Sequence, residues 1–405
     1  MKMPAPTVPP MTSMVASNRP SRRASGCEGP ACVCGSVELK PFTIQQVSKT
    51  SQIQKRRRAR LYNQTGETPI RILIIGGTRN LGLSIVELLC AREHSVTVFN
   101  RGITAGELPP EVERLYGDRS NKKDLQAALA GRSFDAVVDT TLYTGVDTLP
   151  IIQALKQQTG HYIFISTGQV YLIRKGLTRP FREADYEGEL ISAPAQKNSS
   201  DYENWLYGKD KRDAEDLLFA AWNQGRFPVT SLRLPMVNSE RDHYDRILGY
   251  VRRLEDGGPM IVPAGDALSL RHVYGSDVAQ AIVDLIESGR GKGHAINLSQ
   301  DETISLPDFL AMLAETLSVK LKIVPVSRTR LESLQLLPQC SPFSGSWMSA
   351  LDNARSKSEF GIRYTPLAEY LQTIVQHYKN NPHWVPEGYK SREREVRLAD
   401  EGAKS

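Results

Sequence analysis

The sequence predicts an α/β fold: a doubly wound parallel sheet with a smaller C-terminal α/β lobe. Two observations lead to this prediction. First, an apolar segment, residues 72–75, runs directly into a glycine-rich turn and then into a segment with apolar residues at helical spacing. Second, strand-like and helix-like segments alternate from residue 70 onward, which is the pattern of βαβ units.

The glycine-rich turn indicates what the sheet binds. Gly76 allows a tight turn, Gly77 adds backbone freedom, and Gly82 lets the helix pack closely against the strand. The free N–H groups at the helix start can then point at a pyrophosphate. Glycines alone are weak evidence, but a second strand at residues 95–99 follows at the right distance. We therefore predict a Rossmann-type, nucleotide-binding fold whose cradle consists of Gly76, Gly77, Thr78, Arg79, Asn80, Leu81 and Gly82.

The alternation also gives the expected order of elements. Strands are predicted at residues 72–75, 95–99, a short stretch ending near 115–118, 134–139, 162–167 and 229–234. Helices are predicted between them at residues 122–129, 149–158 and 207–222, and residues 171–204 resemble a loop. After Pro235, helices near 244–254, 275–287 and 306–317 alternate with short strands that include 261–262 and 320–324.

Composition and pattern divide the chain into four parts. Residues 1–68 have few large apolar residues and are predicted to be a disordered, basic N-terminal extension. Residues 69–235 would form the NAD(P)-binding domain, and residues 236–381 a substrate-binding lobe that partly interleaves with it. Residues 382–405 are charged and are predicted to be a loose tail.

The positive charge of the chain, +6 at pH 7, is a property of the extension. Residues 1–68 contain eleven Lys and Arg against three acids, so the rest of the chain carries a net charge of about −2. A nearly neutral folded part argues against nucleic-acid binding except through the basic extension. No apolar run approaches the ~20 residues that span a bilayer, so we predict no membrane segment.

Cysteine usage predicts a reducing compartment and no metal site. Only Cys90 and Cys340 lie outside the extension, which is too few for a disulfide framework. Within the extension, Cys27, Cys32 and Cys34 have poor spacing for zinc and lack a fourth ligand.

The extension also bears on location. No acid precedes Glu28, which is the composition of a transit peptide for a plastid or mitochondrion. The basic cluster at residues 55–60 is compatible with a nuclear signal or a nucleic-acid arm. Because nothing in the extension has an apolar helical face, we favour a solvated extension and a cytoplasmic protein.

A second group of residues predicts the chemistry. Tyr207 and Lys211 stand four residues apart on a predicted helix and hence on one face. A phenol has a pKa of ~10 in water, and a nearby ammonium lowers it, so that the phenol can act as acid or base at a carbinol or carbonyl oxygen. Thr167, at the end of the strand 162–167, can hold the same oxygen. The alternative is a solvated surface pair, against which the strand end and the nucleotide turn both argue.

The end of the second strand predicts which nucleotide binds. An NAD-preferring site places Asp or Glu there to hold the ribose 2′-hydroxyl, but this chain has Asn100. An uncharged Asn100 does not repel a 2′-phosphate, and Arg101 and Arg79 could both reach it. We therefore favour NADP over NAD, although Arg101 could instead be an ordinary surface residue.

Taken together, these residues resemble the extended short-chain dehydrogenases/reductases, the superfamily of NAD-dependent epimerases and dehydratases of nucleotide sugars. The resemblance covers residues 70–381 and rests on the turn, Gly117-Asp118, residues 165–171, Tyr207 with Lys211, residues 232–235 and residues 277–279. It implies that Thr167, Tyr207 and Lys211 form the catalytic set and that Lys211 also holds the nicotinamide ribose. It further implies that Asp118 meets the adenine and that the turn with Pro235 and Val237 borders the nicotinamide.

Departures from the family pattern narrow the expectation. Arg79 in the middle of the turn resembles an atypical branch that includes chloroplast stem-loop RNA-binding proteins, but this chain keeps the Tyr/Lys pair, which favours an active enzyme. Gly168 and Gln169 stand where 4,6-dehydratases and decarboxylases of the family carry carboxylates, so neither chemistry is expected. Arg271 lies one residue out of register with the family arginine that binds the pyrophosphate of a sugar nucleotide. A structural salt bridge is an equal interpretation of Arg271.

The leading hypothesis is an NADP-dependent oxidoreductase or epimerase that acts on a small molecule, for example a nucleotide sugar. The alternatives are a non-catalytic RNA-binding or scaffold protein on the same fold and a redox-sensing regulator. The resemblance also implies a homodimer with a four-helix interface that includes the helix of Tyr207.

Overall fold

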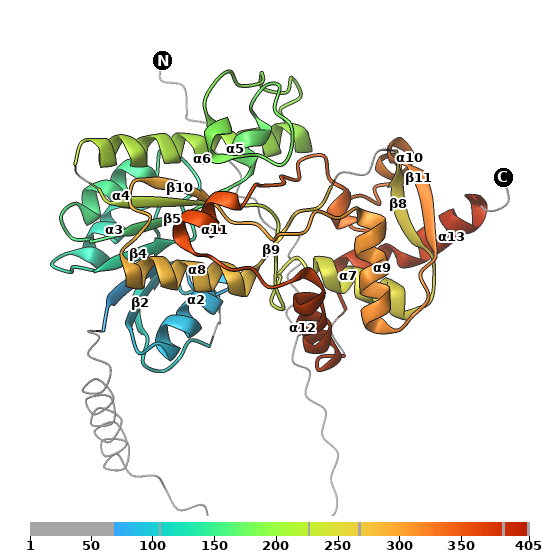
Figure 1. Cartoon of the computed structure of the whole chain (residues 1–405), viewed down its shortest axis with the longest axis horizontal. Coiled ribbons are helices and arrows are strands. Elements are labelled where there is room, and N and C mark those ends of the chain that lie inside the picture. Colours follow the sequence, from blue (N-terminus) through green and yellow to red (C-terminus); the bar gives the residue numbers. More distant parts are fainter. Residues whose placement is uncertain (1–68, 105–106, 226, 266–268, 383–384, 403–405) are drawn as a thin grey trace, which may run out of the picture. The chain divides into compact units, whose positions relative to one another are not determined.

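The structure is a computed structural model that describes residues 69–104, 107–225, 227–265, 269–382 and 385–402 (Figure 1). These residues belong to one compact unit, Thr65–Ser405. The expectations for residues 1–68, namely the disordered basic extension and its role in targeting or nucleic-acid binding, lie outside the described residues.

A parallel sheet forms the centre of the fold. In the described part of the chain, seven strands pair in the order β10-β6-β5-β4-β1-β2-β3, which confirms the doubly wound, Rossmann-type sheet. All of these pairs are parallel. In chain order the strands are β1 (Arg71–Ile75), β2 (Ser95–Asn100), β3 (Glu113–Tyr116), β4 (Ala136–Asp139), β5 (Tyr162–Thr167), β6 (Val229–Leu234) and β10 (His294–Asn297).

Helices cover both faces of the sheet because successive strand residues point to opposite sides. Ile72 and Ile74 of β1 pack in the core with α2 (Asn80–Ala91) and α8 (Gly275–Ser288). Leu73 and Ile75 pack on the other face, under α3 (Lys122–Leu129), α4 (Thr148–Leu155) and α6 (Ser200–Asn223). Figure 1 shows α6 on one side of the strands and α2 with α8 on the other.

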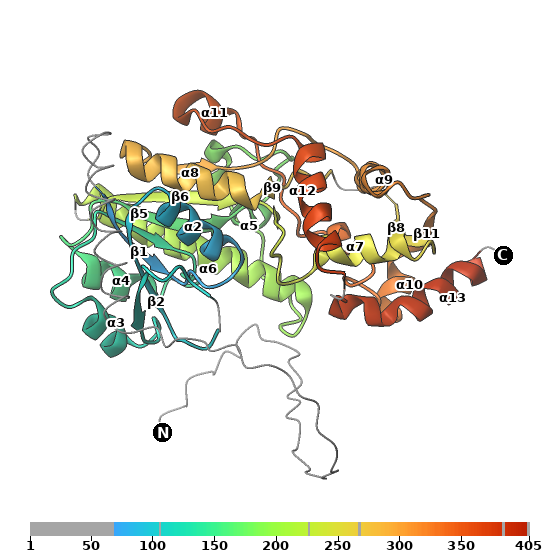
Figure 2. The same ribbon diagram turned by 90° about the horizontal axis from the view of Figure 1, so that it is seen from below.

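The chain after Pro235 contributes to two regions. α8 and β10 complete the central sheet and its covering layer. The remainder builds a C-terminal lobe with its own apolar core (Figure 2). Its elements are β7 (Val237–Asn238), α7 (Arg246–Glu255), β8 (Met260–Ala264), β9 (Val273–Tyr274), α9 (Leu306–Leu317), β11 (Ile323–Ser327), α10 (Arg328–Ser333), η2 (Pro342–Ser344) and α12 (Leu367–Lys379). The helix α11 (Ala354–Phe360) lies beside β10 of the central sheet instead.

The segment expected to be a loop, residues 171–204, contains more structure than predicted. The short helix α5 (Gln169–Leu172) directly follows β5, and a 3-10 turn, η1 (Glu183–Tyr186), follows it. Helix α6 begins at Ser200 rather than near residue 207 because the Ser199 hydroxyl accepts a hydrogen bond from the Tyr202 N–H at 3.2 Å.

The expectation of a loose tail after Pro382 is wrong for the residues that the structure describes. The chain forms η3 (Glu387–Ser391) and then α13 (Arg392–Gly402), which docks against α7. Glu395 is fully buried and accepts hydrogen bonds from the equally buried Arg253 at 2.7 and 2.8 Å. Arg392 forms a second ion pair with Asp256 at 2.6 Å. A charged segment becomes an ordered helix here because the rest of the fold supplies the buried charges of Glu395 and Arg392 with partners.

Within the described residues, no helix is both long and apolar enough to cross a bilayer. The same part of the chain contains no group of three His, Cys, Asp or Glu side chains arranged to hold a metal ion.

Candidate functional site

The turn after β1 has the geometry that its glycines predict. Gly76 and Gly77 adopt φ values of +104° and +85°, a region that residues with side chains rarely enter. A Cβ on Gly82 would lie 2.9 Å from the Cα and N of Gly77, so only glycine allows α2 to begin this close to β1.

The start of α2 is open to an anion. Within the described residues, Arg79 at the N-cap makes no side-chain capping hydrogen bond, so its side chain does not satisfy the N–H groups of the first turn. Those groups and the helix dipole attract a phosphate. The side chain of Asn80 is held by the Ser239 hydroxyl, which donates to its Oδ1 at 2.6 Å. The cradle therefore fits the pyrophosphate of a dinucleotide.

The residues expected around the adenosine lie at the carboxyl ends of β2 and β3. Asn100 ends β2, and its Oδ1 accepts a hydrogen bond from the Gly102 N–H at 2.8 Å. Asp118 lies in the loop after β3 and accepts from the Ser120 N–H at 2.9 Å. Arg101 and Arg79 are both exposed, each just after one of the paired strands β2 and β1.

The structure brings the three predicted catalytic residues together. Thr167 is the last residue of β5, and its side chain is close enough to the phenol of Tyr207 on α6 to lower the pKa of that phenol. The Lys211 Nζ lies 5.9 Å from the centroid of the Tyr207 ring. This ammonium donates to the backbone carbonyls of Leu142 at 2.6 Å and Ile165 at 2.8 Å, which fixes it beneath the site.

The electrostatics of this group differ from the sequence expectation. Burial lowers the pKa of Lys211 to about 7, although the carboxylate of Asp139 acts in the opposite direction. Burial also raises the pKa of Tyr207 above its ordinary value, and the neighbouring Thr167 side chain offsets only part of this rise. The expected lowering of the phenol pKa by Lys211 is absent from this structure, in which desolvation is the largest effect.

Sequence reasoning missed a buried carboxylate below Lys211. Asp139 ends β4 without any exposure and pairs with Arg119 at 2.9 Å. The carboxylate also accepts from the Tyr162 hydroxyl at 2.7 Å and from the Thr141 N–H at 2.9 Å. The sequence did contain a signal for this carboxylate, because the apolar strand at residues 136–139 ends in an acidic residue.

A second buried ion pair braces the strand that carries Thr167. Glu215 lies on α6 one turn after Lys211 and pairs with Arg233 of β6, and both side chains are buried. Ser166 donates a hydrogen bond to the same carboxylate. The Arg233 guanidinium also donates to the Tyr171 hydroxyl at 2.7 Å. These contacts fix β5, β6 and α6 relative to one another.

The turn after β6 adjoins the catalytic strand. The N–H of Gly168 donates to the carbonyl of Leu234 at 2.7 Å, which places Pro235 beside the end of β5. Val237 begins β7 and pairs with Val273. The structure therefore brings Pro235 next to the residues around Thr167, where the resemblance expects the nicotinamide.

Arg271 has a structural environment. Its guanidinium donates to the carbonyl of Gln300 at 3.0 Å and to the side chain of Asn353 at 2.8 Å. The preceding residue, Leu270, is buried. These contacts tie the segment before β9 to the C-terminal lobe and support the structural interpretation of Arg271.

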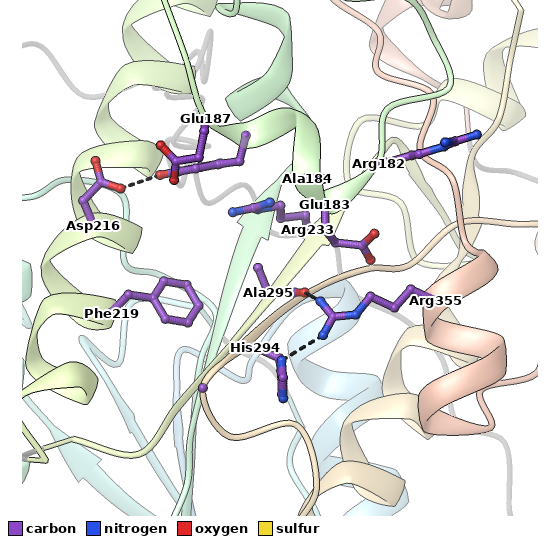
Figure 3. A pocket seen from close by; sticks show the side chains of 12 residues that line it. Arg182, Glu183, Ala184, Glu187, Asp216, Phe219, Arg233, His294, Ala295 and Arg355 are labelled. Atoms are coloured by element: carbon purple, nitrogen blue, oxygen red, sulfur yellow. Dashed lines mark hydrogen bonds between the residues drawn. The ribbon is translucent and has the colours of Figure 1, made fainter.

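A cavity of about 600 Å³ lies beside the edge strand β10, and of the site residues described above only Arg233 lines it (Figure 3). Asp216 in its lining stands nine residues after Tyr207 on α6, which is ~14 Å along a helix axis. Glu183 accepts from the Asn297 N–H at 2.9 Å and Arg355 donates to the Ala295 carbonyl at 3.1 Å. These two side chains satisfy the free edge of β10, so the polar lining protects a sheet edge.

Comparisons with known proteins agree with this geometry. The chain is 24% identical over 237 residues to 2'-dehydrokanamycin reductase of Streptomyces kanamyceticus, covering 58% of this chain and 62% of that protein. It is 27% identical over 253 residues to chloroplast stem-loop binding protein of 41 kDa b of Arabidopsis thaliana, covering 58% and 60%. The chain thus spans about three fifths of the length of these curated relatives.

Solved structures share the fold at low identity. A dTDP-glucose 4,6-dehydratase from Bacillus anthracis, in complex with NAD, superposes with a TM-score of 0.61 at 18% identity, covering 78% of this chain and 98% of that one. A UDP-glucose 4-epimerase from Thermotoga maritima, with UDP-glucose, gives a TM-score of 0.60 at 17% identity, covering 77% and 99%. At such identities the likeness shows the fold alone.

A sequence model of the NAD dependent epimerase/dehydratase family matches residues 72–299, from the first strand of the sheet to just beyond its last. This match covers more than half of the chain and includes the glycine cradle, Thr167, Tyr207 and Lys211. The chain therefore belongs to the NAD dependent epimerase/dehydratase family, whose members bind NAD or NADP.

Proposed function

We propose that the chain is an NAD(P)-dependent oxidoreductase or epimerase that acts at a carbinol or ketone carbon of a small molecule. The observation that carries this proposal is the meeting of Thr167, at the carboxyl end of β5, with Tyr207 and Lys211 of α6. Lys211 lies one helical turn further on, and the glycine cradle stands at the end of the nearby β1. Ligands bind at this edge of such sheets.

In the proposed hydride transfer, Thr167, Tyr207 and Lys211 each have a different role. A bound nicotinamide nucleotide supplies or accepts the hydride. Thr167 orients the substrate oxygen with its hydroxyl. In the reductive direction Tyr207 gives its phenolic proton to the carbonyl oxygen as the carbon gains the hydride, and in the oxidative direction the phenolate takes that proton back. Lys211 supplies a positive charge beneath the ring, which favours the phenolate when that charge is present.

The environment of Gly168 supports the exclusion of elimination chemistry. A Cβ on Gly168 would lie 2.2 Å from the hydroxyl of Ser349, so a carboxylate side chain does not fit there. Gln169 is an amide that donates to Asn204 at 2.7 Å. Neither position offers an acid or base directly after Thr167, so we propose neither 4,6-dehydration nor decarboxylation.

We also propose NADP(H) as the preferred cofactor. Asn100 carries no charge to repel a 2′-phosphate, and its side chain is occupied with the neighbouring backbone. Arg101 directly follows β2 and Arg79 is the N-cap residue of α2, and both are exposed, so a 2′-phosphate would have cations within reach.

The deciding experiment identifies the nucleotide that the purified protein releases on denaturation. An epimerase regenerates its cofactor in every cycle and can retain it, so near-stoichiometric oxidised nucleotide supports epimerisation. A protein that is purified without nucleotide but binds added NADPH supports a reductase. The similarity to 2'-dehydrokanamycin reductase favours this outcome. A protein that neither retains nor binds any nicotinamide nucleotide contradicts the proposal.

One observation favours a second candidate, an RNA-binding or scaffold protein without catalysis. It is the similarity to the chloroplast stem-loop binding protein, together with the basic residues of 1–68. Deletion of residues 1–68 shows whether RNA affinity comes from the extension or from the folded domain. If the affinity disappears with the extension, the folded domain does not bind RNA.

We propose a homodimer whose four-helix interface includes α6, as the resemblance implies, and we add α4 as the second helix of each protomer. The strongly exposed Val146 and half-exposed Leu149, at the start of α4, support this face. Light scattering of the purified protein tests it, and a monomer at micromolar concentration contradicts it.

A further inference from the structure

The turn after β4, residues 140–142, contacts both the end of β1 and the Lys211 ammonium. On one side, the N–H and the hydroxyl of Thr140 donate to the carbonyl of Ile75 at 3.0 and 2.9 Å. Ile75 is the last residue of β1 and directly precedes the glycine cradle. On the other side, the carbonyl of Leu142 accepts from the Lys211 Nζ at 2.6 Å. A movement of this turn would therefore move the ammonium.

Asp139, the last residue of β4, holds the middle of this turn. Its Oδ1 accepts from the N–H of Thr141 at 2.9 Å and from the hydroxyl of the same residue at 3.3 Å. Its Oδ2 accepts from the Tyr162 hydroxyl at 2.7 Å and from the Arg119 guanidinium at 2.9 Å. The carboxylate is fully buried, and hydrogen bonds are stronger in such surroundings than in water. It thus fixes Thr141 relative to β4 and β5.

Arg119 supports the same turn from a distant part of the sheet. It lies in the loop after β3, and the strand order places β1 and β2 between β3 and β4. Three strand spacings separate β3 from β4, which is about 14 Å. Arg119 nevertheless pairs with Asp139 at 2.9 Å and donates to the Thr141 carbonyl at 3.4 Å. The loop and its arginine together therefore span the carboxyl ends of β1 and β2, where the glycine cradle lies.

We propose that Arg119 and Asp139 are positioning residues for Lys211. They hold the turn 140–142, and the carbonyl of Leu142 at the end of that turn holds the ammonium in place. This inference rests on the proposed function, because the pair acts on the hydride transfer through Lys211 and without contact with the substrate. A misplacement of about 1 Å that originates far from the chemistry can cost about 10²-fold in rate, so such support matters to turnover.

The first test observes Lys211 by NMR and needs no substrate. The lysines of the full chain are labelled with carbon-13 at the ε position, and the Lys211 signal is the one that Lys211→Met removes. A lysine held in one position gives two separate ε-proton shifts, whereas a lysine that moves between rotamers averages them. Arg119→Met combined with Asp139→Asn removes both buried charges, so neither is left unpaired. We expect the two ε-proton shifts of Lys211 to merge in this double variant.

Two single variants accompany the double variant. Arg119→Lys keeps a positive charge beside Asp139 and should retain most of the separation between the two ε-proton shifts. Arg119→Gln gives the same readout as the double variant if that variant does not fold, because Asp139 then keeps its bonds from Thr141 and Tyr162.

The matched control breaks an Arg–Asp pair at the other end of the same strand. Arg71 and Asp135 pair at 3.0 Å, and Asp135 directly precedes β4. Arg71→Met combined with Asp135→Asn should leave the Lys211 signal unchanged, because that pair lies at the opposite edge of the sheet. A Lys211 signal that stays unchanged without the Arg119–Asp139 pair overturns the proposal, and so does an equal change in the control.

The second test follows turnover with NADPH and 9,10-phenanthrenequinone as the carbonyl probe. We expect the Arg119/Asp139 double variant to lower kcat about 10-fold to 100-fold and to change KM much less, because a displaced ammonium affects proton transfer more than binding. A moved Lys211 signal with an unchanged kcat confirms that the pair holds Lys211 and contradicts the role of Lys211 in the proposed function. A wild-type protein that binds no nicotinamide nucleotide overturns that function, while the NMR comparison still decides whether the pair positions Lys211.

Discussion

The glycine-rich turn after β1 and the helix α13 near the end of the chain are specified in different ways. In the turn, Gly82 meets Gly77, five residues away, and the geometry that binds a nucleotide follows from that local approach. In α13, Glu395 meets Arg253, which is 142 residues distant in the sequence. A local pattern can be recognised from the sequence, whereas a distant partner cannot.

The two regions also differ in what supports them energetically. The turn depends on the absence of side chains, because a Cβ at Gly82 has no space. The docking of α13 depends on a buried ion pair, in which each charge is tolerable only because the other is present. Substitutions should therefore affect function in the first region and stability in the second.

The largest expected effect concerns Tyr207 of α6, which belongs to the same functional site as the turn. Tyr207→Phe removes the phenolic proton that the proposed chemistry needs and should lower kcat about 10³-fold. The ring and the helix remain, so NADPH affinity and the melting temperature should stay close to those of the wild type. Steady-state kinetics and fluorescence titration with NADPH measure both. A variant that keeps substantial turnover would remove Tyr207 from the mechanism.

The next effect tests the distant pair. Arg253→Met leaves the Glu395 carboxylate buried without its main partner and should cost about 3–5 kcal/mol in the free energy of unfolding. Urea denaturation followed by circular dichroism measures this loss. The double replacement Arg253→Met with Glu395→Leu should recover most of the stability, because both buried charges are gone. A single variant as stable as the wild type would show that α13 does not depend on the pair.

This difference explains how far the sequence predicts the structure. The strands β1, β5 and β6 and the helix α3 follow from apolar periodicity and lie where the sequence places them. The convergence of Thr167, Tyr207 and Lys211 follows from a strand end and a helix spacing. The strands, α3 and the Tyr207–Lys211 spacing depend on a few neighbouring residues, and they meet Thr167 because the carboxyl ends of parallel strands form one ligand-binding edge.

What the sequence does not predict depends on the surroundings. The pKa of Tyr207 rises through burial, which no spacing reveals. Arg271 finds Gln300 and Asn353 only after the C-terminal lobe has packed. The exposed ring of Tyr143 lies 6.5 Å from that of Tyr207, a residue distant in sequence, and no local pattern predicts this contact.

A third prediction tests the close approach in the turn. Gly82→Ala places a methyl group 2.9 Å from the Gly77 backbone, so the start of α2 must shift. We expect a loss of about 1–3 kcal/mol in stability and a clear fall in NADPH affinity. Gly345→Ala is the matched control, since the added Cβ would meet only Met348 at 3.9 Å. Equal NADPH affinities in the two variants would contradict the role of the close contact.

A fourth prediction concerns the buried ammonium of Lys211. Its pKa falls to about 7 in the folded protein, against ~10.4 when unfolded. Between these values the unfolded state binds the proton and the folded state does not, so stability rises with pH by up to about 1.4 kcal/mol per unit. The free energy of unfolding, compared with that of Lys211→Met without nucleotide, should therefore increase from pH 7 to 9. Parallel pH profiles would place the pKa of Lys211 near its ordinary value.

The smallest expected effect concerns Arg101, an exposed residue directly after β2, the strand that pairs with β1. Arg101→Ala should raise the Kd for NADPH about tenfold, because one charge-assisted contact with the 2′-phosphate is lost. Affinity for NADH, which lacks that phosphate, should not change, and it serves as the internal control in the same titration. Equal losses for both nucleotides would mean that Arg101 supports the turn itself. No loss for either would leave Arg79 as the cation to replace next.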